Sequence, residues 1–450
     1  MLRRRFVIGA ASAAAAVPLA GLPGCGGGSP NDSPTPVPPS EVVLRLPADM
    51  YMHPGAPTEW WWHTGTLKAG NRVFGFEINA ASFFKDGFAF SQVMLTDVEK
   101  NRHYQRTTPF APPVLFDANT WAESDTKKDW YARLGSETNH LSSIELTNGG
   151  SGYTSTPTVE ITGGGGSGAF ALAVVGKTGI VEAIALVLPG DGYTSVPTLR
   201  ITGGGGSGAT AFAYHSYISM KAPAADPTKN MKVKSLLNDQ DTHTEVMFDL
   251  TLSQQGPPFF VWGTGINPDG TGQTLQTRNY YFSLTRLQAS GTITIGTEKH
   301  TVSGVTWMDH EYGAFGTSAN PVKWFLQDMQ LDNGYCISNY ATMASGESPA
   351  LNRKTASTCT VQAADGTTWY VPSFVTPIGK TWTSPNSGAT FFLQFHVEIP
   401  SFNASLIVDT PVAAQEFPLP GNAVYEGVAT VSGTFQFASV SGTAWNEQAL

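Results

Sequence analysis

The sequence is poor in charged residues. Only 14% of its 450 residues are Asp, Glu, Lys or Arg, and the formal net charge is −9. No cluster of Lys or Arg occurs after residue 5. The chain therefore lacks the basic surface with which proteins bind a phosphate backbone, and we predict no nucleic-acid partner. Hydrophobic residues make up 41% of the chain, which is enough to bury large cores in two or three domains.

Long amphipathic helical patterns are also missing beyond residue 42. Short runs rich in Val, Ile, Thr, Tyr and Phe alternate apolar and polar residues instead, and 48 Gly and 30 Pro separate them. Asn333-Gly334 and Asp365-Gly366 are typical of hairpin turns. The pattern predicts an all-β chain of antiparallel sheets. The expected strands are 72–84, 90–98, 245–252, 279–287, 291–295, 302–312, 323–331, 335–342, 358–363, 367–371, 390–399 and 424–437.

Common hydrolase motifs are absent. The sequence contains neither a G-x-S-x-G nor an H-E-x-x-H pattern, because Ala314 stands where the second His of the latter would be needed after His310-Glu311. A metal site built from Asp309, His310 and Glu311 is not expected. On a strand His310 would point away from the other two, and zinc prefers further His or Cys ligands. We therefore predict no metal and no other cofactor.

The first 25 residues resemble an export signal. Arg3-Arg4-Arg5-Phe6-Val7 is similar to a twin-arginine signal, and an Ala-rich apolar run, too short for a good membrane span, follows to Leu22. Leu22-Pro23-Gly24-Cys25 resembles a bacterial lipobox, which predicts lipid attachment at Cys25; loss of Cys25 with a plain signal peptide is the alternative. Residues 26–41 form a Gly/Ser/Pro linker. We expect an exported protein of the bacterial cell envelope or periplasm, anchored to the membrane through lipid.

Only three cysteines occur. If Cys25 is lipidated, Cys336 and Cys359 remain as an even pair in an oxidising compartment, and each lies in a strand-like run. A disulfide between them would stabilise the fold by roughly 3 kcal/mol on the loop-entropy model. Two buried thiols are an equally weighted alternative.

One Gly-rich block occurs twice. The pattern at residues 150–169 recurs at 190–209, with G-x-G-Y-T-S near the start and I-T-G-G-G-G-S-G-A at the end. Such a repeat needs a neighbour to bury its apolar face. Each glycine run also matches G-x-G-x-x-G, but a strand-like pattern follows it instead of a helix, so turn geometry explains the glycines better than dinucleotide binding. We expect a small β-rich insert over about residues 138–216 that interrupts the first domain.

Two short segments combine Trp with acidic residues, Glu59-Trp60-Trp61-Trp62-His63 and Trp307-Met308-Asp309-His310-Glu311-Tyr312. Alternate residues of a strand point to opposite faces. Within each segment, the first, third and fifth residues should therefore share one face, and the others should lie on the opposite face. A carboxyl group in an apolar wall holds its proton longer than in water, which suits protonation of an apolar substrate. A well-packed barrel interior is the competing interpretation.

These segments resemble bacterial carotenoid 1,2-hydratases (hydroxyneurosporene synthases) and their secreted lipocalin-like relatives. The matching pieces are PTEWWWHTG at 57–65, GFE at 75–77, YYFSLTRL at 280–287, VSGVTWMDHEYG at 302–313, YEG at 425–427 and Glu447. The resemblance covers about residues 42–136 and 217–450, and the repeat block is foreign to it. It implies two tandem lipocalin-like antiparallel β-barrel domains, at residues 42–288 and 289–450, with the insert in the first.

The resemblance also implies a reaction, namely acid-assisted hydration or cyclisation of an apolar unsaturated molecule of isoprenoid or polyene type. Such a reaction needs a proton donor and aromatic faces that shelter a cation. Asp309 is the expected acid, with Glu311 or Glu59 as its partner and His310 orienting an acid across the domain junction. The expected walls of the substrate site are Trp60, Trp61, Trp307 and Tyr312.

A second hypothesis stays open. Glu59, Asp309, His310 and Arg286 could instead form a buried polar network that joins the two barrels. The protein would then be a non-catalytic envelope lipoprotein that binds an apolar ligand. Both hypotheses require an apolar small-molecule ligand, and the sequence does not predict an oligomeric state.

Overall fold

The computed structural model describes residues 34–83, 88–110, 129–135, 140–268, 272, 274–315, 323–343, 347–419 and 422–450. Cys25, the export segment at residues 1–25 and residues 26–33 of the linker lie outside the described residues. Within these ranges no helix is both long enough and apolar enough to cross a membrane. The helical elements that are described are short 3-10 turns, η1 (Pro39–Glu41), η2 (Ala48–Met50) and η4 (Pro400–Phe402). The prediction of an all-β chain is confirmed.

An 11-stranded antiparallel sheet curls into a half-barrel and forms the first domain. Its strand order is β4-β3-β2-β1-β17-β16-β14-β13-β12-β5, and β15 (Phe259–Phe260) pairs with β16. The concave face buries one large apolar core that includes Trp61, Trp130 and Phe282. The strands are β1 (Thr58–Ala69), β2 (Arg72–Phe83), β3 (Phe88–Asp97), β4 (Arg102–Phe110), β5 (Asp129–Leu134), β12 (Tyr217–Pro223), β13 (Met231–Asn238), β14 (Glu245–Gln254), β16 (Asn279–Ile295) and β17 (Glu298–Gly313).

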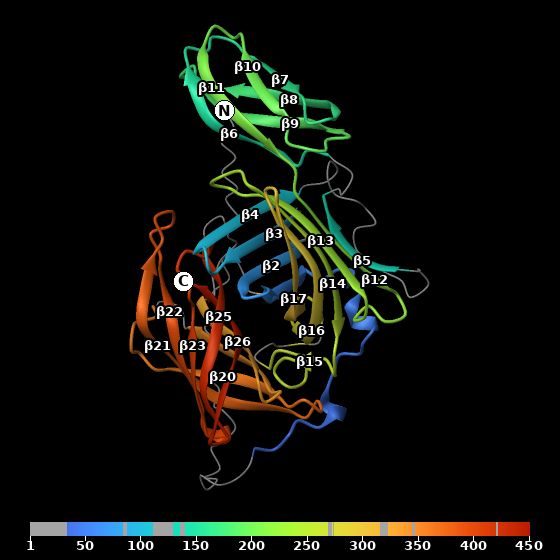
Figure 1. Ribbon diagram of the computed structural model, residues 1–450, viewed down its shortest axis with the longest axis vertical. Coiled ribbons are helices and arrows are strands. Elements are labelled where there is room, and N and C mark those ends of the chain that lie inside the picture. The colour runs from blue at the N-terminus through green and yellow to red at the C-terminus, as the bar shows by residue number, and fades with distance from the viewer. Residues whose placement is uncertain are drawn as a thin grey trace.

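The second domain is a closed barrel. Its strand order is β23-β22-β21-β20-β19-β18-β26-β25-β24, and pairing of β23 with β25 closes eight strands into a ring. Buried Phe325, Phe395 and Leu406 belong to its interior. The strands are β18 (Lys323–Leu331), β19 (Cys336–Met343), β20 (Thr355–Gln362), β21 (Thr368–Thr383), β22 (Thr390–Ile399), β23 (Ala404–Asp409), β24 (Glu416–Leu419), β25 (Asn422–Phe435) and β26 (Ala438–Ala449). Figure 1 shows this barrel beside the half-barrel.

The division between the two sheets differs from the expected one at residue 288/289. That position lies inside β16, which pairs with β17 from Asn279 to Ile295, and β17 pairs in turn with β1. The second sheet begins only at Lys323. The expected strands 279–287 and 291–295 are one strand, and Gly291 within it is a point of close approach: a Cβ there would overlap the backbone of Asp249 on β14. The glycine therefore lets one long strand continue.

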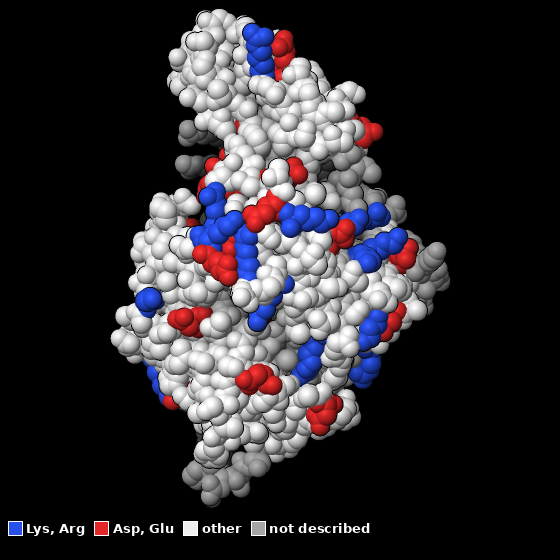
Figure 2. Space-filling model, in the orientation of Figure 1, with Lys and Arg blue, Asp and Glu red and all other residues white. Residues whose placement is uncertain are grey.

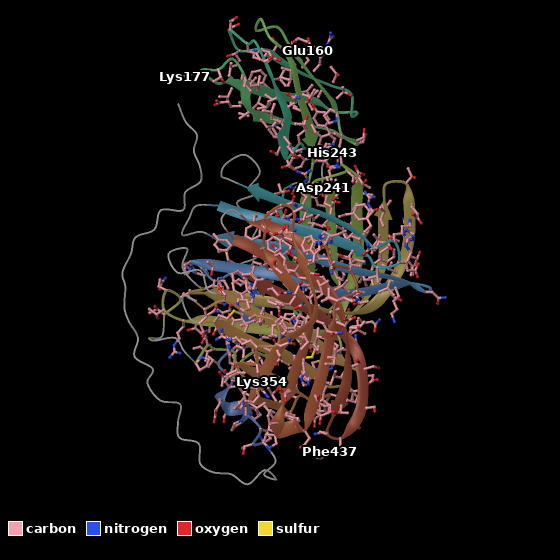
Figure 3. All side chains as sticks on the ribbon, turned by 90° about the vertical axis from the view of Figure 1, so that its left-hand side faces the viewer. Glu160, Lys177, Asp241, His243, Lys354 and Phe437 are labelled. Carbon is pink, nitrogen blue, oxygen red and sulfur yellow. The ribbon has the colours of Figure 1, made fainter. Side chains whose placement is uncertain are left out.

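The insert is a separate small β unit between β5 and β12, as predicted. Its strands are β6 (Ser143–Ser151), β7 (Thr158–Thr162), β8 (Ser167–Val175), β9 (Val181–Asp191), β10 (Thr198–Thr202) and β11 (Ser207–Tyr214). They form two sheets, β10-β7-β8-β9 and β11-β6, around a core of their own. The insert lies at one end of the molecule and carries Glu160 and Lys177, whereas Phe437 lies at the other end (Figure 3).

The two copies of the repeat are joined by reciprocal backbone hydrogen bonds. The backbone N–H of Thr194 donates to Gly164 O at 2.8 Å, and that of Thr154 donates to Gly204 O at 2.8 Å. Both glycines have positive φ, and a Cβ on either would overlap the opposite copy. Contact between the two copies therefore explains the glycine runs. Each run is followed by a strand, β8 or β11, whereas a dinucleotide site would need a helix there.

We predict that the insert can be removed without unfolding the rest. β5 and β12 pair directly, with Leu134 opposite Ile218, and the Ser142 N–H donates to Tyr214 O at 2.9 Å. Joining Ser142 to Tyr214 through an Asn-Gly turn should leave the main thermal unfolding transition within about 1 kcal/mol of the full chain, because the deleted part has its own core. Loss of the near-UV circular dichroism of the two-domain body would contradict this.

Candidate active site at the domain junction

The two domains meet through the outer face of the half-barrel and the outer wall of the barrel. Trp62 and Met94 from the first domain pack with Val424, Val428 and Trp445 from the second. Gly75 lies so close to Val428 that a Cβ at Gly75 would overlap that side chain. The junction is therefore a tightly packed apolar interface, and any polar group inside it needs a partner.

Six carboxyl groups lie in this junction. Glu77 on β2 faces it, and so do Asp309 and Glu311 on β17, with solvent-exposed fractions of 0%, 8% and 7%. The barrel contributes Asp328, Glu426 and Glu447, of which the first two are buried and Glu447 is half-buried. Glu426 and Glu447 are direct cross-strand partners. We call these six residues the junction acids.

Three of the junction acids accept a hydrogen bond from a Trp indole N–H. Trp307 Nε1 donates to Asp309 Oδ1 at 2.7 Å, Trp324 Nε1 to Glu447 Oε1 at 2.6 Å, and Trp445 Nε1 to Glu426 Oε2 at 2.6 Å. Glu77 Oε1 accepts from the Asn79 amide at 3.2 Å. Asp309 also accepts from the Ser283 hydroxyl at 2.6 Å, and Glu311 accepts from the Asn279 amide. All of these donors are neutral.

The junction acids hold their protons more tightly than carboxyls in water. Burial raises the pKa of Asp309 to about 6, although bonds from Ser283, Trp307 and Tyr281 oppose it. Burial, together with the charge of Asp309, raises the pKa of Glu447 to about 8. Burial and neighbouring carboxylates raise the pKa values of the other four junction acids well above those of Asp and Glu in water. These four are Glu77, Glu311, Asp328 and Glu426. Paired charges such as Arg72–Glu298 lie instead on the surface, where Figure 2 shows a belt of mixed sign.

Aromatic rings stand beside the junction acids. Trp60 lies directly across from Glu311 in the β1–β17 register, and its ring meets Phe315 edge-on with centroids 5.0 Å apart. Phe315 meets Trp324 of the barrel at 5.8 Å. These three rings bridge the two domains and form a wall that could shelter an apolar molecule or a cation next to the acids.

A small cavity of about 10 Å³ lies against the acids. Trp307, Asp328, Gln330 and Trp445 are among its lining residues. The Oδ1 atom of Asp328 is buried and has no hydrogen-bond partner among the described residues. A space of this size next to an unpaired carboxyl oxygen suits one water molecule.

The predicted alternation of side chains along β1 and β17 is confirmed, and it separates the predicted site into two. Asp309, Glu311, Trp60 and Trp307 face the junction. Glu59, His310, Trp61 and Tyr312 lie on the concave side of the half-barrel, where Trp61 and Tyr312 belong to its core.

Glu59 therefore cannot be the partner of Asp309, and His310 does not orient an acid across the junction. His310 Nδ1 lies 2.8 Å from Trp60 O, and its Nε2 lies 3.5 Å from Glu59 Oε1. Glu59 is held instead by His53, whose Nδ1 is 2.8 Å from Glu59 Oε1. Burial lowers the pKa of His53, but the bonds to Asp49 and Glu59 outweigh it and raise the pKa to about 9.

The structure also answers two questions that the sequence left open. Arg286 does join the domains, but it donates to Gln362 Oε1 at 2.9 Å and Gly334 O at 2.8 Å, not to the predicted network. Cys336 and Cys359 are free and buried. Cys336 lies opposite Gln362 and Cys359 opposite Asn339, so the three-residue offset puts the two thiols on opposite faces of the barrel wall.

The structure adds four junction acids that were not among the predicted site residues. Glu77, Glu426 and Glu447 occur in the short segments that carried the family resemblance, which was the available signal. Asp328 has no such signal. It lies in the expected strand 323–331 and reaches the site only because β18 packs against the first domain.

Comparison with known proteins supports the fold. A sequence model of the family described as AttH-like matches residues 198–447. The crystal structure of an AttH protein from Nitrosomonas europaea is 16% identical, with a TM-score of 0.57 over 92% of this chain and 98% of the other. Kievitone hydratase from Nectria haematococca is 16% identical, with a TM-score of 0.54 over 93% and 96%. At this identity the likeness shows the fold alone. None of the curated proteins compared with the chain matches it.

We predict that Gly75 sets the spacing of the junction. Gly75→Ala should lower the free energy of unfolding by roughly 1–3 kcal/mol, because its Cβ would collide with Val428. Combining it with Val428→Ala should recover part of that loss, which urea unfolding followed by Trp fluorescence would measure as a favourable coupling energy. Strict additivity of the two changes would show that the faces do not touch here.

A second prediction concerns pH. Because the folded pKa of Glu447 is about 8, above the usual 4.5, its contribution to stability is complete below about pH 4.5 and is lost as pH rises toward 8. Glu447→Gln keeps an acceptor for Trp324 and cannot ionise. Its free energy of unfolding relative to wild type should therefore rise by roughly 1–3 kcal/mol between pH 5 and pH 9.

The matched control is Glu398→Gln, which removes a carboxyl that pairs with Lys354 on the surface of the same barrel. Its difference from wild type should show no such rise. A pH-independent difference for Glu447→Gln in chemical unfolding would contradict the buried, proton-holding state of Glu447.

Proposed function

The chain belongs to the AttH-like family, and we propose that it is a hydratase-type enzyme that protonates a carbon–carbon double bond of an apolar small molecule at the domain junction. The observation that carries the proposal is the set of junction acids. Six carboxyls share one interface, their hydrogen-bond donors are neutral, and aromatic rings adjoin them. A structural ion-pair network would use Lys or Arg as partners, whereas proton transfer needs carboxyls that keep a proton near neutral pH.

The acid best suited to donate is Glu447. Its pKa of about 8 keeps it protonated at pH 7, and it is the least buried of the junction acids. Asp309 accepts hydrogen bonds from both Ser283 and Trp307, which favours its charged form. Asp309 then stabilises positive charge on the substrate. This assignment revises the expectation that Asp309 is the donor.

The proposed step moves one proton and adds one water. Glu447 gives its proton to one alkene carbon, and the other carbon becomes a cation beside the faces of Trp60 and Trp324. A water held at Asp328 forms the new C–O bond and releases a proton to a carboxylate of the cluster. The cluster thus ends with as many protons as it began with. In cyclisation, a second double bond of the same molecule replaces water as the nucleophile, and the new carbocation loses a proton from a neighbouring carbon to a carboxylate of the cluster.

The substrate class is proposed from the family resemblance. Segments 57–65 and 302–313 are similar to carotenoid 1,2-hydratases, so an isoprenoid or polyene is the proposed substrate, and a 1,2-hydration is the finer form of the proposal. The name of the fold relative kievitone hydratase also supports hydration. We further propose that the protein works in the bacterial cell envelope or periplasm, held by lipid at Cys25; the sequence at residues 22–25 is the support for this.

The test is incubation with squalene or lycopene in detergent and ¹⁸O-labelled water, followed by mass spectrometry. Wild type should yield a product heavier by one labelled water. Glu447→Gln should lower the rate by about 10²–10⁴-fold, the range for a lost general acid. Asp309→Asn should also lower it, whereas Glu398→Gln should leave it unchanged. Recovery of the same unmodified compound from wild type and variants would instead indicate the alternative, a non-catalytic apolar-ligand-binding envelope lipoprotein.

A further inference from the structure

A second cluster of titratable side chains lies on the concave side of the half-barrel, behind the junction. It contains His53, Glu59 and His310, whose ligand atoms all lie within 4.8 Å of one another. The closest pairs are His53 Nδ1 to Glu59 Oε1 at 2.8 Å and His310 Nε2 to Glu59 Oε1 at 3.5 Å. Ligand atoms around a tetrahedral zinc ion are about 3.4 Å apart, given metal–ligand distances near 2.1 Å. His53 and Glu59 would therefore move slightly apart around an ion, the His310–Glu59 distance already fits, and the remaining pair, within 4.8 Å, would move closer.

The Nε2 atom of His310 is buried, points at Glu59 and makes no hydrogen bond with a described residue. A carbonyl oxygen cannot donate a hydrogen bond, so the bond of 2.8 Å between His310 Nδ1 and Trp60 O places the ring hydrogen on Nδ1. Nε2 then turns a lone pair toward the carboxylate of Glu59, and it has no hydrogen-bond partner among the described residues. A doubly protonated ring would be costly, because His310 is completely buried and packs against Trp61 and Phe282.

Both histidines are held in the way that metal-binding histidines usually are. His310 uses its other nitrogen on the carbonyl of Trp60, and His53 Nε2 lies 3.3 Å from Asp49 Oδ1. Tyr312 donates to the same Asp49 oxygen at 3.3 Å and stacks on the His53 ring with centroids 3.5 Å apart. Such outer partners fix the tautomer and the ring direction of a ligand histidine.

We propose that His53, Glu59 and His310 bind one divalent first-row transition metal ion, with zinc as the expected occupant. Two nitrogen ligands and one carboxylate leave a fourth position for water, which is the arrangement of an open zinc site. The ion would enter past His53, whose side chain is 18% exposed, while Glu59 and His310 are enclosed. The site lies on the opposite face of the β1–β17 pair from the junction acids, so it is independent of the proposed hydration.

The test uses the full chain without a histidine tag, stripped of metal by a chelator. Calorimetric titration with Zn²⁺ should give one ion per chain, and Co²⁺ should give the visible absorption bands of a four- or five-coordinate ion. His53→Ala and Glu59→Gln should each weaken binding at least about 100-fold, as expected for loss of a direct ligand. His300→Ala, which removes a histidine far from the cluster, should bind as wild type does.

Asp49→Asn keeps all three ligands and removes only the charge behind His53. Asp49→Asn should weaken metal binding by about 10–100-fold, the usual effect of losing an outer partner. It replaces a ligand variant in the test if near-UV circular dichroism shows that the ligand variant does not fold. Absence of stoichiometric binding by wild type, or equal binding by wild type, His53→Ala and Asp49→Asn, would overturn the proposal. Neither outcome bears on the hydration assay, whose readout is product formation.

Discussion

The junction depends on one constraint: several carboxyls are buried between two sheets, and no Lys or Arg among the described residues forms an ion pair with them. An ionised carboxylate in an apolar interface is costly unless it is paired or well hydrogen-bonded. This chain meets the cost with neutral donors. The indole N–H groups of Trp307, Trp324 and Trp445 each donate to one carboxyl, and the protons that the acids retain reduce the remaining charge. Each Trp also supplies the apolar surface that docks the domains, so packing and proton storage depend on the same side chains.

The β1–β17 pair carries a different cluster of titratable side chains on each of its two faces. Alternate residues point to opposite faces of a strand, so Asp309 and Glu311 face the barrel while His310, between them, faces the half-barrel core with Glu59. The His310–Trp60 hydrogen bond links the faces, because Trp60 O receives His310 while the Trp60 ring lies beside the junction acids. Displacement of either strand by one residue would exchange both sets of side chains at once.

The sequence predicted those features of the structure that depend on the local alternation of apolar and polar residues or on a repeat. The all-β class, the alternation within 59–63 and 307–312, and the β-rich insert all follow from patterns within a few residues or from a repeat. Partners across domains could not be predicted in this way. Glu447 and Asp328 meet Asp309 only after two sheets dock, and nothing near them in the chain specifies that docking. The expected strands 279–287 and 291–295 are one continuous strand for the same reason: Gly291 pairs with Leu250 on β14, and neighbouring strands decide whether such a residue ends a strand.

The size of the junction cavity constrains how a substrate could reach the acids. The space of about 10 Å³ beside Asp328 suits a water, whereas sites for small molecules usually enclose several hundred Å³. An isoprenoid chain must therefore occupy positions where side chains now touch. The rings of Trp60, Phe315 and Trp324 meet edge-on, and Glu447 beside them is only half-buried. Trp60 also packs on Phe83, so its movement would cost that contact. Movement of these rings would open a path to the acids, whereas separation at Gly75 and Val428 would have to break a close contact between the two domains. A path through the aromatic wall leaves the water-sized space at Asp328 intact for the step that needs it.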